Sequence, residues 1–415
     1  MDSNELEKIK NITNTYQATS LFSSWQSARE LGYTVALWQL PFQKEKQLVV
    51  NFSKDIARKK IVLEDLEPGF AFSPFLNMEG HDTLFIEADL YYSFGEKGEI
   101  LTEKKSDSLP LFQKEKWEKH CQSIGSVVAD KNHAIDFPQQ NETNTSKEHY
   151  LNSVRAAIAS IKSGHLKKVV ISRTKEVVDL PSNLSLLTIF ERLCKKYPTA
   201  FVSMVYLPQL DQVWLGATPE ILVAMNKEGI FRTVALAGTQ SIFDKEGQTI
   251  AAKQALWSQK EIEEQALVGR YIISCFKKIR VREYLEEGPK SVMAGNLIHL
   301  MSDYVVDTKA INFPEIGTVM LELLHPTSAV CGMPKMEALQ FIQTHEGYNR
   351  EFYSGFLGPV NIEQETHLFV NLRCMKIEQG KATIYAGGGI TEDSVPEKEW
   401  QETELKTQTM LAVLQ

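Results

Sequence analysis

Two segments of this 415-residue chain carry pairs of glutamates that a helix would place on one face. The first pair is Glu261 and Glu264, in a helix predicted over about 254–279. At about 100° per residue, these side chains lie within about 60° of each other, in line with an apolar stripe that contains Val268 and Ile272. Acidic residues near a helix N-terminus are also favoured by the helix dipole, so this helix alone leaves a functional and a structural explanation open.

The second pair repeats the pattern near the end of the sequence. Glu399 and Glu402 head a helix predicted over about 395–414, and Met410 and Val413 extend the same face. Two inward-facing pairs of carboxylates repel each other unless a cation lies between them. Carboxylates without His or Cys suit a hard, oxygen-seeking ion, and this pattern therefore predicts a Mg²⁺ site.

Three further segments could bind or react with an anion, although each also has a plain structural explanation. The glycines at 387–389 follow a predicted strand, where they form either a tight turn or a backbone that an anion can approach closely. Arg373 provides either a guanidinium group that can donate two hydrogen bonds to a carboxylate or one partner of a surface ion pair. Lys168 opens a predicted strand and Glu220 follows a turn, positions at which charged side chains are usually solvated.

The composition is that of an ordinary globular protein. Hydrophobic residues make up 43% of the chain and charged residues 24%, which argues against a disordered or fibrous chain. The net charge of -8 provides no general attraction to nucleic acid or to anionic membranes. No apolar run approaches the roughly 18 residues of a membrane span. An anionic ligand would therefore need a local cluster of cations.

Cysteine and histidine usage excludes two further classes of site. The five cysteines are widely scattered without a CxxC pair, and the nine histidines form no HExxH motif. These spacings argue against a disulfide framework and against zinc chemistry. The polar N-terminal segment shows no signal peptide. We therefore expect reduced thiols and a cytoplasmic location.

The elements that position these residues are hairpin strands mixed with long helices. Strands are predicted at 34–38, 47–52, 85–92, 169–172, 201–206, 213–216, 220–226, 370–377 and 382–386, and helices at 149–163, 184–197, 254–279 and 395–414. Adjacent hairpins with long helices indicate an α+β fold rather than a doubly wound parallel sheet. The polar stretch 137–146 is the best candidate for a linker.

Nine motifs occur in an order that resembles one enzyme family. They are KKVVISR (167–173), GATPEILV (216–223), LAGT (236–239), SQKEIEEQ (258–265), HLMSD (299–303), HPTSAVCGMPK (325–335), REFYSG (350–355), NLRCMK (371–376) and AGGGITEDSVPEKEWQETELK (386–406). Together they resemble the chorismate-utilising enzymes, which include isochorismate, salicylate, anthranilate and aminodeoxychorismate synthases. The resemblance divides the chain into a variable N-terminal part over 1–145 and a chorismate-binding catalytic region over 146–412.

The resemblance implies a large α/β/β/α fold like that of anthranilate synthase component I, and a Mg²⁺-dependent reaction on chorismate. It implies that the metal ligands are Glu264 and Glu402, with Glu261 and Glu399 as the carboxylates beside them. The residues implied to hold the substrate's carboxylates are Tyr353, Arg373, Gly387 and Lys406. The positions implied to line the ring pocket are Leu236, Thr239 and His299.

Two positions distinguish the branches of this family. Isochorismate and salicylate synthases activate water with a lysine that matches Lys168, and anthranilate synthases, which use ammonia, lack it. Aminodeoxychorismate synthases carry a nucleophilic lysine where this sequence has Ala237. The combination of Lys168 and Ala237 therefore favours the water-using branch. Glu220 matches the general acid that protonates the departing C4 hydroxyl.

These features predict an isomerase, isochorismate synthase, that serves menaquinone or siderophore biosynthesis by adding water at C2 and removing the C4 hydroxyl of chorismate. A salicylate synthase, which goes on to eliminate pyruvate, is the first alternative, and anthranilate synthase component I is the second. A catalytically silent chorismate-binding protein is disfavoured, because the acid, the base and the metal carboxylates are all present. The expected partners are chorismate and Mg²⁺, without nucleic acid, membrane or an obligatory glutaminase subunit, in a monomer or weak homodimer.

Overall fold

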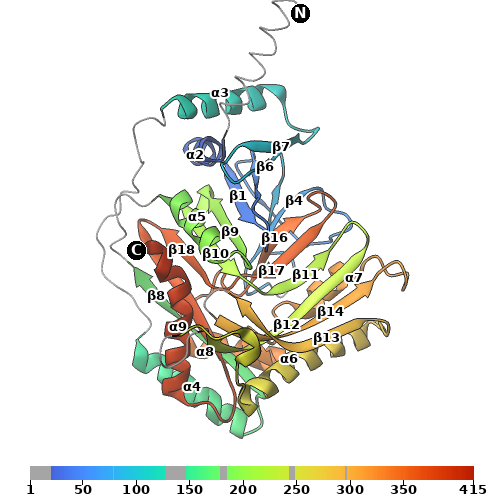
Figure 1. The fold of residues 1–415 in the computed structure, drawn as a ribbon, viewed down its shortest axis with the longest axis vertical. Coiled ribbons are helices and arrows are strands. Elements are labelled where there is room, and N and C mark those ends of the chain that lie inside the picture. The colour runs from blue at the N-terminus through green and yellow to red at the C-terminus, as the bar shows by residue number, and fades with distance from the viewer. Residues whose placement is uncertain (1–19, 78, 128–145, 178–184, 243–247, 295–296) are drawn as a thin grey trace, which may run out of the picture.

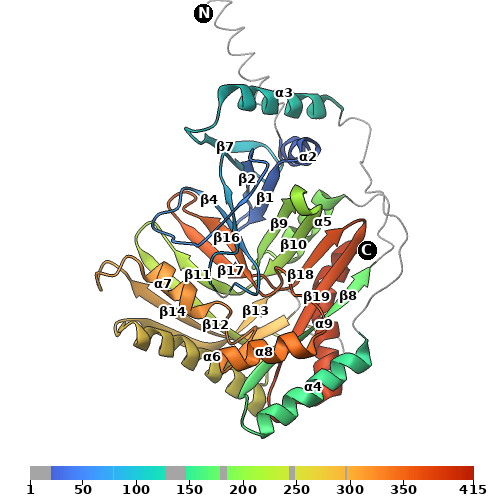
Figure 2. The ribbon, with the colours of Figure 1, turned by 180° about the vertical axis from the view of Figure 1, so that it is seen from behind.

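The computed structural model of the protein describes residues 20–77, 79–127, 146–177, 185–242, 248–294 and 297–415. Two large sheets pack against each other, and helices cover their outer sides (Figure 1, Figure 2). The strand pairings within both sheets of the described residues are antiparallel. The predicted α+β class is therefore confirmed.

Both sheets contain strands from the first 145 residues as well as from the later part of the chain. The larger sheet runs, in spatial order, through β15 (Gly332–Met333), β8 (Lys168–Val177), β19 (Lys381–Ile390), β18 (Cys374–Glu378), β10 (Gln212–Thr218), β9 (Phe201–Leu207), β1 (Thr34–Gln39), β2 (Lys46–Asn51), β6 (Leu90–Phe94) and β7 (Ile100–Lys105). The smaller sheet runs through β13 (Leu285–Ala294), β14 (Leu297–Asp307), β12 (Ile230–Ser241), β11 (Ile221–Met225), β17 (Thr366–Val370), β16 (Phe356–Val360), β4 (Gly69–Ser73), β5 (Thr83–Glu87) and β3 (Ala57–Lys59).

Aromatic side chains fill the space between the two sheets. Phe201 of β9 stacks on Phe369 of β17, with ring centroids 4.2 Å apart. Trp214 of β10 meets Phe72 of β4 edge to face at 6.1 Å. These rings are buried, and such pairs add to the free energy already gained by burying their surface. The contacts fix the two sheets as one packed body.

Helices on the outer sides complete the layers. The helices are α2 (Leu21–Leu31), α3 (Leu111–Val127), α4 (Lys147–Lys162), α5 (Leu186–Lys196), α6 (Gln259–Lys278), α7 (Ile316–Leu324), α8 (Lys335–His345) and α9 (Pro396–Leu414). Helices α2, α5 and α9 pack on the larger sheet, and α6 and α7 pack on the smaller one. In α6, Val268, Ile272 and Phe276 are buried at helical spacing, as the apolar stripe predicts.

Two predicted strands are wrong because the chain changes sheets inside them. The apolar stretch 85–92 divides at a turn into β5 and β6, which belong to different sheets. The stretch 370–377 likewise divides, since β17 ends at Val370 and β18 begins at Cys374 in the other sheet. The residues between β17 and β18 include Arg373, whose φ of 45° lies in the left-handed region. This crossing is therefore what positions Arg373.

Several other predictions can be compared directly with the structure. The helices and strands predicted after residue 146 correspond to α4, α5, α6, α9, β8, β9, β10, β11 and β19. The predicted linker lies outside the described residues except for Ser146, whose side chain caps the start of α4. Among the described helices, none combines the length and the apolar character that crossing a bilayer demands.

Candidate active site

A cavity opens between the two sheets and the helices α6 and α9. Its lining includes residues from β8, β12, β14 and β19, together with side chains of both helices. Counted with its open mouth, the space measures about 770 Å³. Ten of the thirteen predicted site residues line it: Glu220, Leu236, Thr239, Glu264, His299, Tyr353, Arg373, Gly387, Glu402 and Lys406.

Two adjacent lysines at the start of β8 have opposite environments. Lys167 is exposed to solvent, whereas Lys168 is completely buried, as expected for successive residues of an extended chain. Lys168 Nζ donates a hydrogen bond to Glu264 Oε1 over 2.7 Å. Val170, on the same side of β8, lines the cavity. Lys168 is therefore the lysine of the pair that reaches the site.

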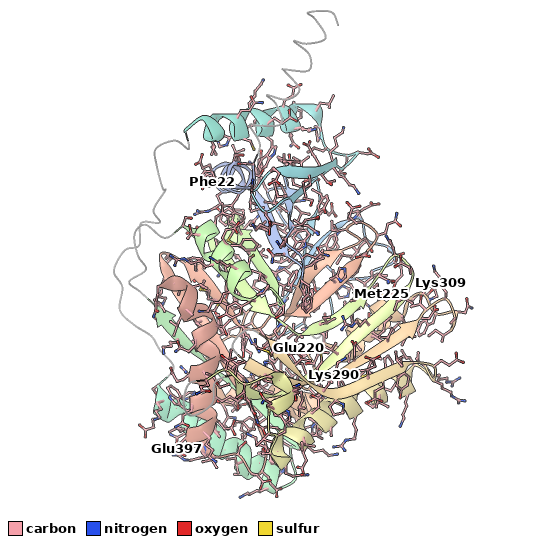
Figure 3. The ribbon with its side chains drawn as sticks, viewed as in Figure 1. Phe22, Glu220, Met225, Lys290, Lys309 and Glu397 are labelled. Atoms are coloured by element: carbon pink, nitrogen blue, oxygen red, sulfur yellow. The ribbon has the colours of Figure 1, made fainter. Side chains whose placement is uncertain are left out.

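Glu220 lies at the corner between β10 and β11, where the chain passes from one sheet to the other. Glu220 is only 6% exposed and lines the cavity. Figure 3 labels it near the middle of the molecule. Burial raises the pKa of Glu220 to about 7, although the positive charges of Lys168, Arg373 and Lys406 oppose this shift. A carboxyl with this pKa holds a proton near neutral pH and can release it, as a general acid must.

Arg373 and His299 form a contact on the cavity wall. Arg373 Nη2 lies against His299 Nε2, and His299 Nδ1 lies 2.7 Å from the carbonyl oxygen of Gly238. Because a carbonyl only accepts, Nδ1 carries the proton and Nε2 is the acceptor. Burial, together with the charge of Arg373, lowers the pKa of His299 well below its ordinary value, so the ring is neutral. Burial lowers the pKa of Arg373 to about 10, which leaves it charged at neutral pH.

The three glycines at 387–389 belong to strand β19, beside β8, so a tight turn is the wrong explanation for them. A Cβ on Gly387 would lie 2.9 Å from the hydroxyl of Tyr353 and 2.9 Å from Cβ of Ser172. Lys406 Nζ donates a hydrogen bond to the carbonyl oxygen of Gly387 over 2.8 Å. Because these glycines have no side chains, Ser172, Tyr353 and Lys406 can approach the strand closely.

Three predicted metal carboxylates gather along this glycine strand. A Cβ on Gly388 would lie 3.4 Å from Glu399 Oε2 and 3.7 Å from Glu402 Oε1. A Cβ on Gly389 would collide with Glu264 Oε1. The order of the chain places these carboxylates far apart, and only the packing of α6 and α9 against β19 brings them together.

Each of these three carboxylates forms an ion pair with a lysine. The pairs are Lys168–Glu264 at 2.7 Å, Lys260–Glu399 at 2.6 Å and Lys406–Glu402 at 2.7 Å. Among the described residues, no three carboxylate, histidine or cysteine side chains are arranged so that they could hold a metal ion together in this structure. The local charge is instead balanced by side chains of the protein.

The fourth predicted carboxylate, Glu261, has a different role in this structure. Its Oε2 accepts a hydrogen bond from the backbone N–H of Ser258 over 2.7 Å, at the start of α6. This contact satisfies one of the helix N–H groups that has no partner within the helix. Glu261, Glu399 and Lys168 are the three predicted site residues outside the cavity lining. Of these, the carboxylate of Glu399 lies at the glycine strand, whereas that of Glu261 is bound to the backbone at the start of α6.

The donor atoms nevertheless fit a hard divalent cation. Glu399 is 2% exposed, and its Oε2 is buried without a hydrogen bond from any described residue. Burial raises the pKa of Glu399, with Lys260 opposing this shift and Glu402 adding to it. The hydroxyl of Tyr150 is also buried without a partner in the described residues, and it would lie 3.8 Å from a Cβ on Gly388. Oxygen ligands with unmet bonding capacity are what Mg²⁺ binds.

An irregularity in β12 shapes the opposite wall of the cavity. The register between β12 and β14 shifts between Ala237 and Gln240, and Gly238 within this bulge has a φ of 66°. In a regular strand, neighbouring side chains point to opposite faces, but here Leu236, Ala237 and Thr239 all line the cavity. The bulge also supplies the carbonyl of Gly238 to His299. Gln240 turns away and donates to the backbone of Leu256.

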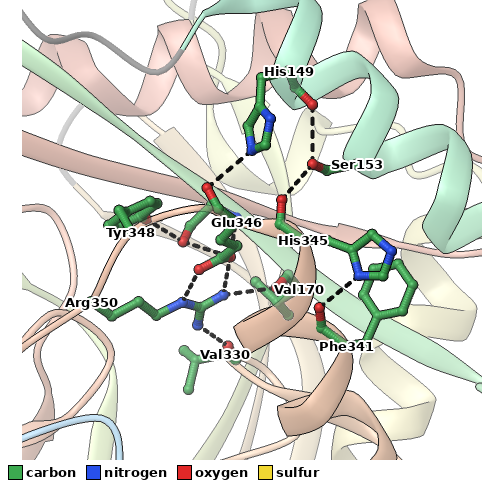
Figure 4. A network of polar contacts seen from close by, with 10 residues as sticks. His149, Ser153, Val170, Val330, Phe341, His345, Glu346, Tyr348 and Arg350 are labelled. Atoms are coloured by element: carbon green, nitrogen blue, oxygen red, sulfur yellow. Dashed lines mark hydrogen bonds and ion pairs between the residues drawn. The ribbon is translucent and has the colours of Figure 1, made fainter.

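A buried ion pair behind the cavity was not predicted as part of the site. Arg350 donates to Glu346 Oε2 over 2.8 Å and to the carbonyl oxygens of Val170 and Val330, each over 2.8 Å (Figure 4). Glu346 Oε1 accepts from the backbone N–H of Ser172 over 2.6 Å. Both valines line the cavity, so this pair braces two of its walls. The only sequence signal was the place of Arg350 in the motif REFYSG, to which no role was attached.

Comparison with known proteins identifies the family. A family model described as "Chorismate binding enzyme" matches residues 99–415. The chain belongs to this family. The isochorismate synthase EntC of Escherichia coli (strain K12) is 30% identical over 268 residues, which are 63% of this chain and 65% of that enzyme. The match thus spans less than two thirds of the length of EntC.

Two solved structures share the fold of this chain. The structure of MenF, the menaquinone-specific isochorismate synthase from Escherichia coli, superposes with a TM-score of 0.69 at 21% identity and covers 92% of this chain and 89% of MenF. Anthranilate synthase component I from Streptococcus pneumoniae gives a TM-score of 0.66 at 18% identity, covering 91% and 92% of the two chains. At these identities the similarity establishes the fold. It confirms the predicted likeness to anthranilate synthase component I.

Proposed function

We propose that this protein is an isochorismate synthase that uses Mg²⁺ to convert chorismate into isochorismate. One observation carries the proposal: Glu220, a buried carboxyl with a pKa near 7, lines the cavity, and the fully buried Lys168 contacts Glu264 of the same lining. Lys168 is also the charge that most opposes the raised pKa of Glu220. A base and an acid at one cavity suit a reaction in which one proton is removed and another is supplied.

The proposed reaction is balanced in atoms and charge. Lys168 takes a proton from a water molecule as the water oxygen bonds to C2, the ring double bonds shift, and the C4–oxygen bond breaks. Glu220 gives its proton to the departing C4 hydroxyl, which leaves as water. One water enters and one leaves, so the product is an isomer of chorismate.

Lys168 can act as a base only when its amine is neutral. In this structure its Nζ is instead held in a buried ion pair with the carboxylate of Glu264. The proposal therefore requires the contact between Lys168 and Glu264 to be lost in the reacting complex. Glu264 would then be available as an oxygen ligand.

The remaining cavity residues would bind and orient the substrate. Arg373, Lys406, the backbone at Gly387 and the hydroxyl of Tyr353 could hold carboxylates, and Leu236, Thr239 and His299 would contact the ring. A Mg²⁺ ion bound by Glu264 and Glu402, with Glu399 beside them, would supply positive charge for the ring carboxylate. These side chains would hold C2 close to Lys168 and C4 close to Glu220.

A product assay distinguishes this function from the related reactions that form salicylate or anthranilate. Purified protein is incubated with chorismate and Mg²⁺, and isochorismate, salicylate and pyruvate are measured separately, with a parallel reaction that contains ammonium. We expect isochorismate alone. Salicylate with an equal amount of pyruvate would instead identify a salicylate synthase. Anthranilate formed only with ammonium would contradict the role of water, and no product at all would contradict the activity.

Removal of the metal should abolish activity. We expect turnover to fall to background in EDTA and to return when excess Mg²⁺ is added, because the ring carboxylate would lose its counter-charge. Glu264→Gln and Glu402→Gln should each raise the Mg²⁺ concentration for half-maximal activity by roughly tenfold or more. Glu263→Gln is the matched control, since Glu263 is an exposed neighbour on α6. Full turnover after exhaustive dialysis against EDTA would rule out the metal site.

Arg373→Ala should impair substrate binding more than chemistry. A charge-assisted hydrogen bond to a carboxylate contributes about 1.5–3 kcal/mol, so kcat/KM should fall roughly 10- to 100-fold, mainly through a higher KM. Steady-state kinetics with chorismate measures the change. Arg270→Ala removes an exposed arginine of α6 and serves as the control. An unchanged kcat/KM in Arg373→Ala would show that this arginine does not contact the substrate.

A further inference from the structure

Lys260 is the one member of the three lysine–carboxylate pairs at the cavity to which neither the sequence nor the proposed reaction assigns a role. It lies at the start of α6, and its Nζ donates to Glu399 Oε1 of α9 over 2.6 Å. Its charge also interacts with Glu402 and Glu264. Lys260 therefore places one positive charge near all three carboxylates that gather at the glycine strand.

The two partners of this pair differ in their freedom to move. The side chain of Glu399 is 2% exposed, and that of Lys260 is 28% exposed. Glu399 cannot reach water without unpacking α9, whereas the four-carbon stem of a lysine allows its ammonium to swing into solvent. The pair can thus open by movement of Lys260 alone, leaving the Glu399 carboxylate in place.

If Lys260 leaves, the buried carboxylate of Glu399 needs another positive charge beside it. Glu399 Oε2 already accepts no hydrogen bond from the described residues, so departure of Lys260 would remove the one positive charge paired with this carboxylate and leave it only the neutral hydroxyl of Ser394. A buried carboxylate in that state is unfavourable unless another cation replaces the lysine. The neighbouring oxygens of Glu402 and Glu399 lie on the same side of the glycine strand, where one ion can serve both.

We propose that Lys260 is an internal counter-ion for the carboxylate cluster, and that a divalent cation and Lys260 compete for Glu399. Lys260 keeps the acidic residues in place in the metal-free protein, and it weakens metal binding because the ion must displace it. This inference rests on the proposed function only in taking the competing ion to be the Mg²⁺ of that reaction. It makes Lys260 a residue that determines metal affinity rather than a ligand.

Direct metal binding tests the competition. Mn²⁺, which takes the same oxygen ligands and is visible by electron paramagnetic resonance, is titrated into the full-length protein without chorismate. Lys260→Met, which keeps the length of the side chain but removes its charge, should bind Mn²⁺ roughly tenfold more tightly or better, the size expected for loss of one charge-assisted contact. The gain should disappear in the Lys260→Met/Glu399→Gln double variant. Lys398→Met, at an exposed lysine beside Glu399, should match wild type.

Thermal unfolding provides an independent readout. Lys260→Met should unfold at a lower temperature than wild type in EDTA, and the difference should shrink at saturating Mn²⁺, because the ion replaces the missing charge. Lys260→Gln repeats both measurements if the methionine variant folds poorly. Unchanged or weaker Mn²⁺ binding by Lys260→Met, or no Mn²⁺ binding by any of the proteins, would overturn the inference.

The product assay distinguishes the role of Lys260 from the proposed function. Isochorismate formation with unchanged Mn²⁺ affinity in Lys260→Met would refute only the role of Lys260. Tighter Mn²⁺ binding without isochorismate formation would refute only the proposed function.

Discussion

Lys168→Ala should lower the rate of isochorismate formation by about 10²- to 10⁴-fold, because a general base typically contributes that much. The structure makes this variant informative, since Lys168 is completely buried and its Nζ contacts Glu264 at 2.7 Å. Steady-state kinetics with chorismate and saturating Mg²⁺ measures the loss. Because removal of Lys168 also leaves a buried carboxylate unpaired, Lys168→Met is measured beside it, and thermal unfolding verifies that both variants are folded.

The neighbouring lysine is a control for this prediction. Lys167 is exposed, and Lys167→Ala should retain nearly the wild-type rate. Loss of activity in Lys167→Ala with normal activity in Lys168→Ala would mean that the other lysine is the base. Normal activity in both variants would exclude a lysine base and would favour a reaction that uses ammonia.

Glu220→Gln should produce a loss of similar size, about 10²- to 10⁴-fold in kcat. Glutamine keeps the shape of the side chain but cannot give a proton to the C4 hydroxyl, so the bond to that oxygen should not break at a useful rate. The variant should still bind chorismate, which isothermal titration with Mg²⁺ can measure. Glu228→Gln changes an exposed glutamate of the following hairpin and should be silent. Wild-type turnover by Glu220→Gln would exclude Glu220 as the acid.

The pH dependence of the wild-type enzyme tests the same residue without mutation. Burial raises the pKa of Glu220 to about 7, so the carboxyl is protonated below that pH and ionised above it. An acid must be protonated before it acts, and kcat/KM should therefore fall as the pH rises through about 7. A kcat/KM that stays constant from pH 6 to 9 would be inconsistent with Glu220 as the acid.

Much of the site could be predicted from sequence because the apolar residues of its two helices recur with the period of an α-helix. The stripe that contains Val268 and Ile272 identifies the buried face of α6 and places Glu264 at its head. The same reasoning applies to Glu399 and Glu402 on α9, and both are at the glycine strand in the structure. Periodicity therefore predicts which side of a helix faces inward, even where the residues on that side are charged.

Strands and long-range pairs were less predictable, for physical reasons. An apolar run has the same appearance whether it continues in one sheet or turns a corner into another, which is why 370–377 was predicted as one strand although Arg373 lies at a crossing. The partner of a charged residue depends on packing between distant segments. Lys168 and Glu264 are 96 residues apart, and Lys260 and Glu399 are 139 apart. No local pattern encodes these contacts.

The origin of the new hydroxyl group tests the central claim most directly. Chorismate is converted in water enriched in ¹⁸O, in the presence of Mg²⁺, and the isochorismate formed is analysed by mass spectrometry during the first turnovers. Attack of water at C2 with loss of the C4 hydroxyl predicts one ¹⁸O atom in each isochorismate molecule. Unlabelled isochorismate would mean that the hydroxyl migrates from C4 to C2, and it would contradict the proposed roles of Lys168 and Glu220.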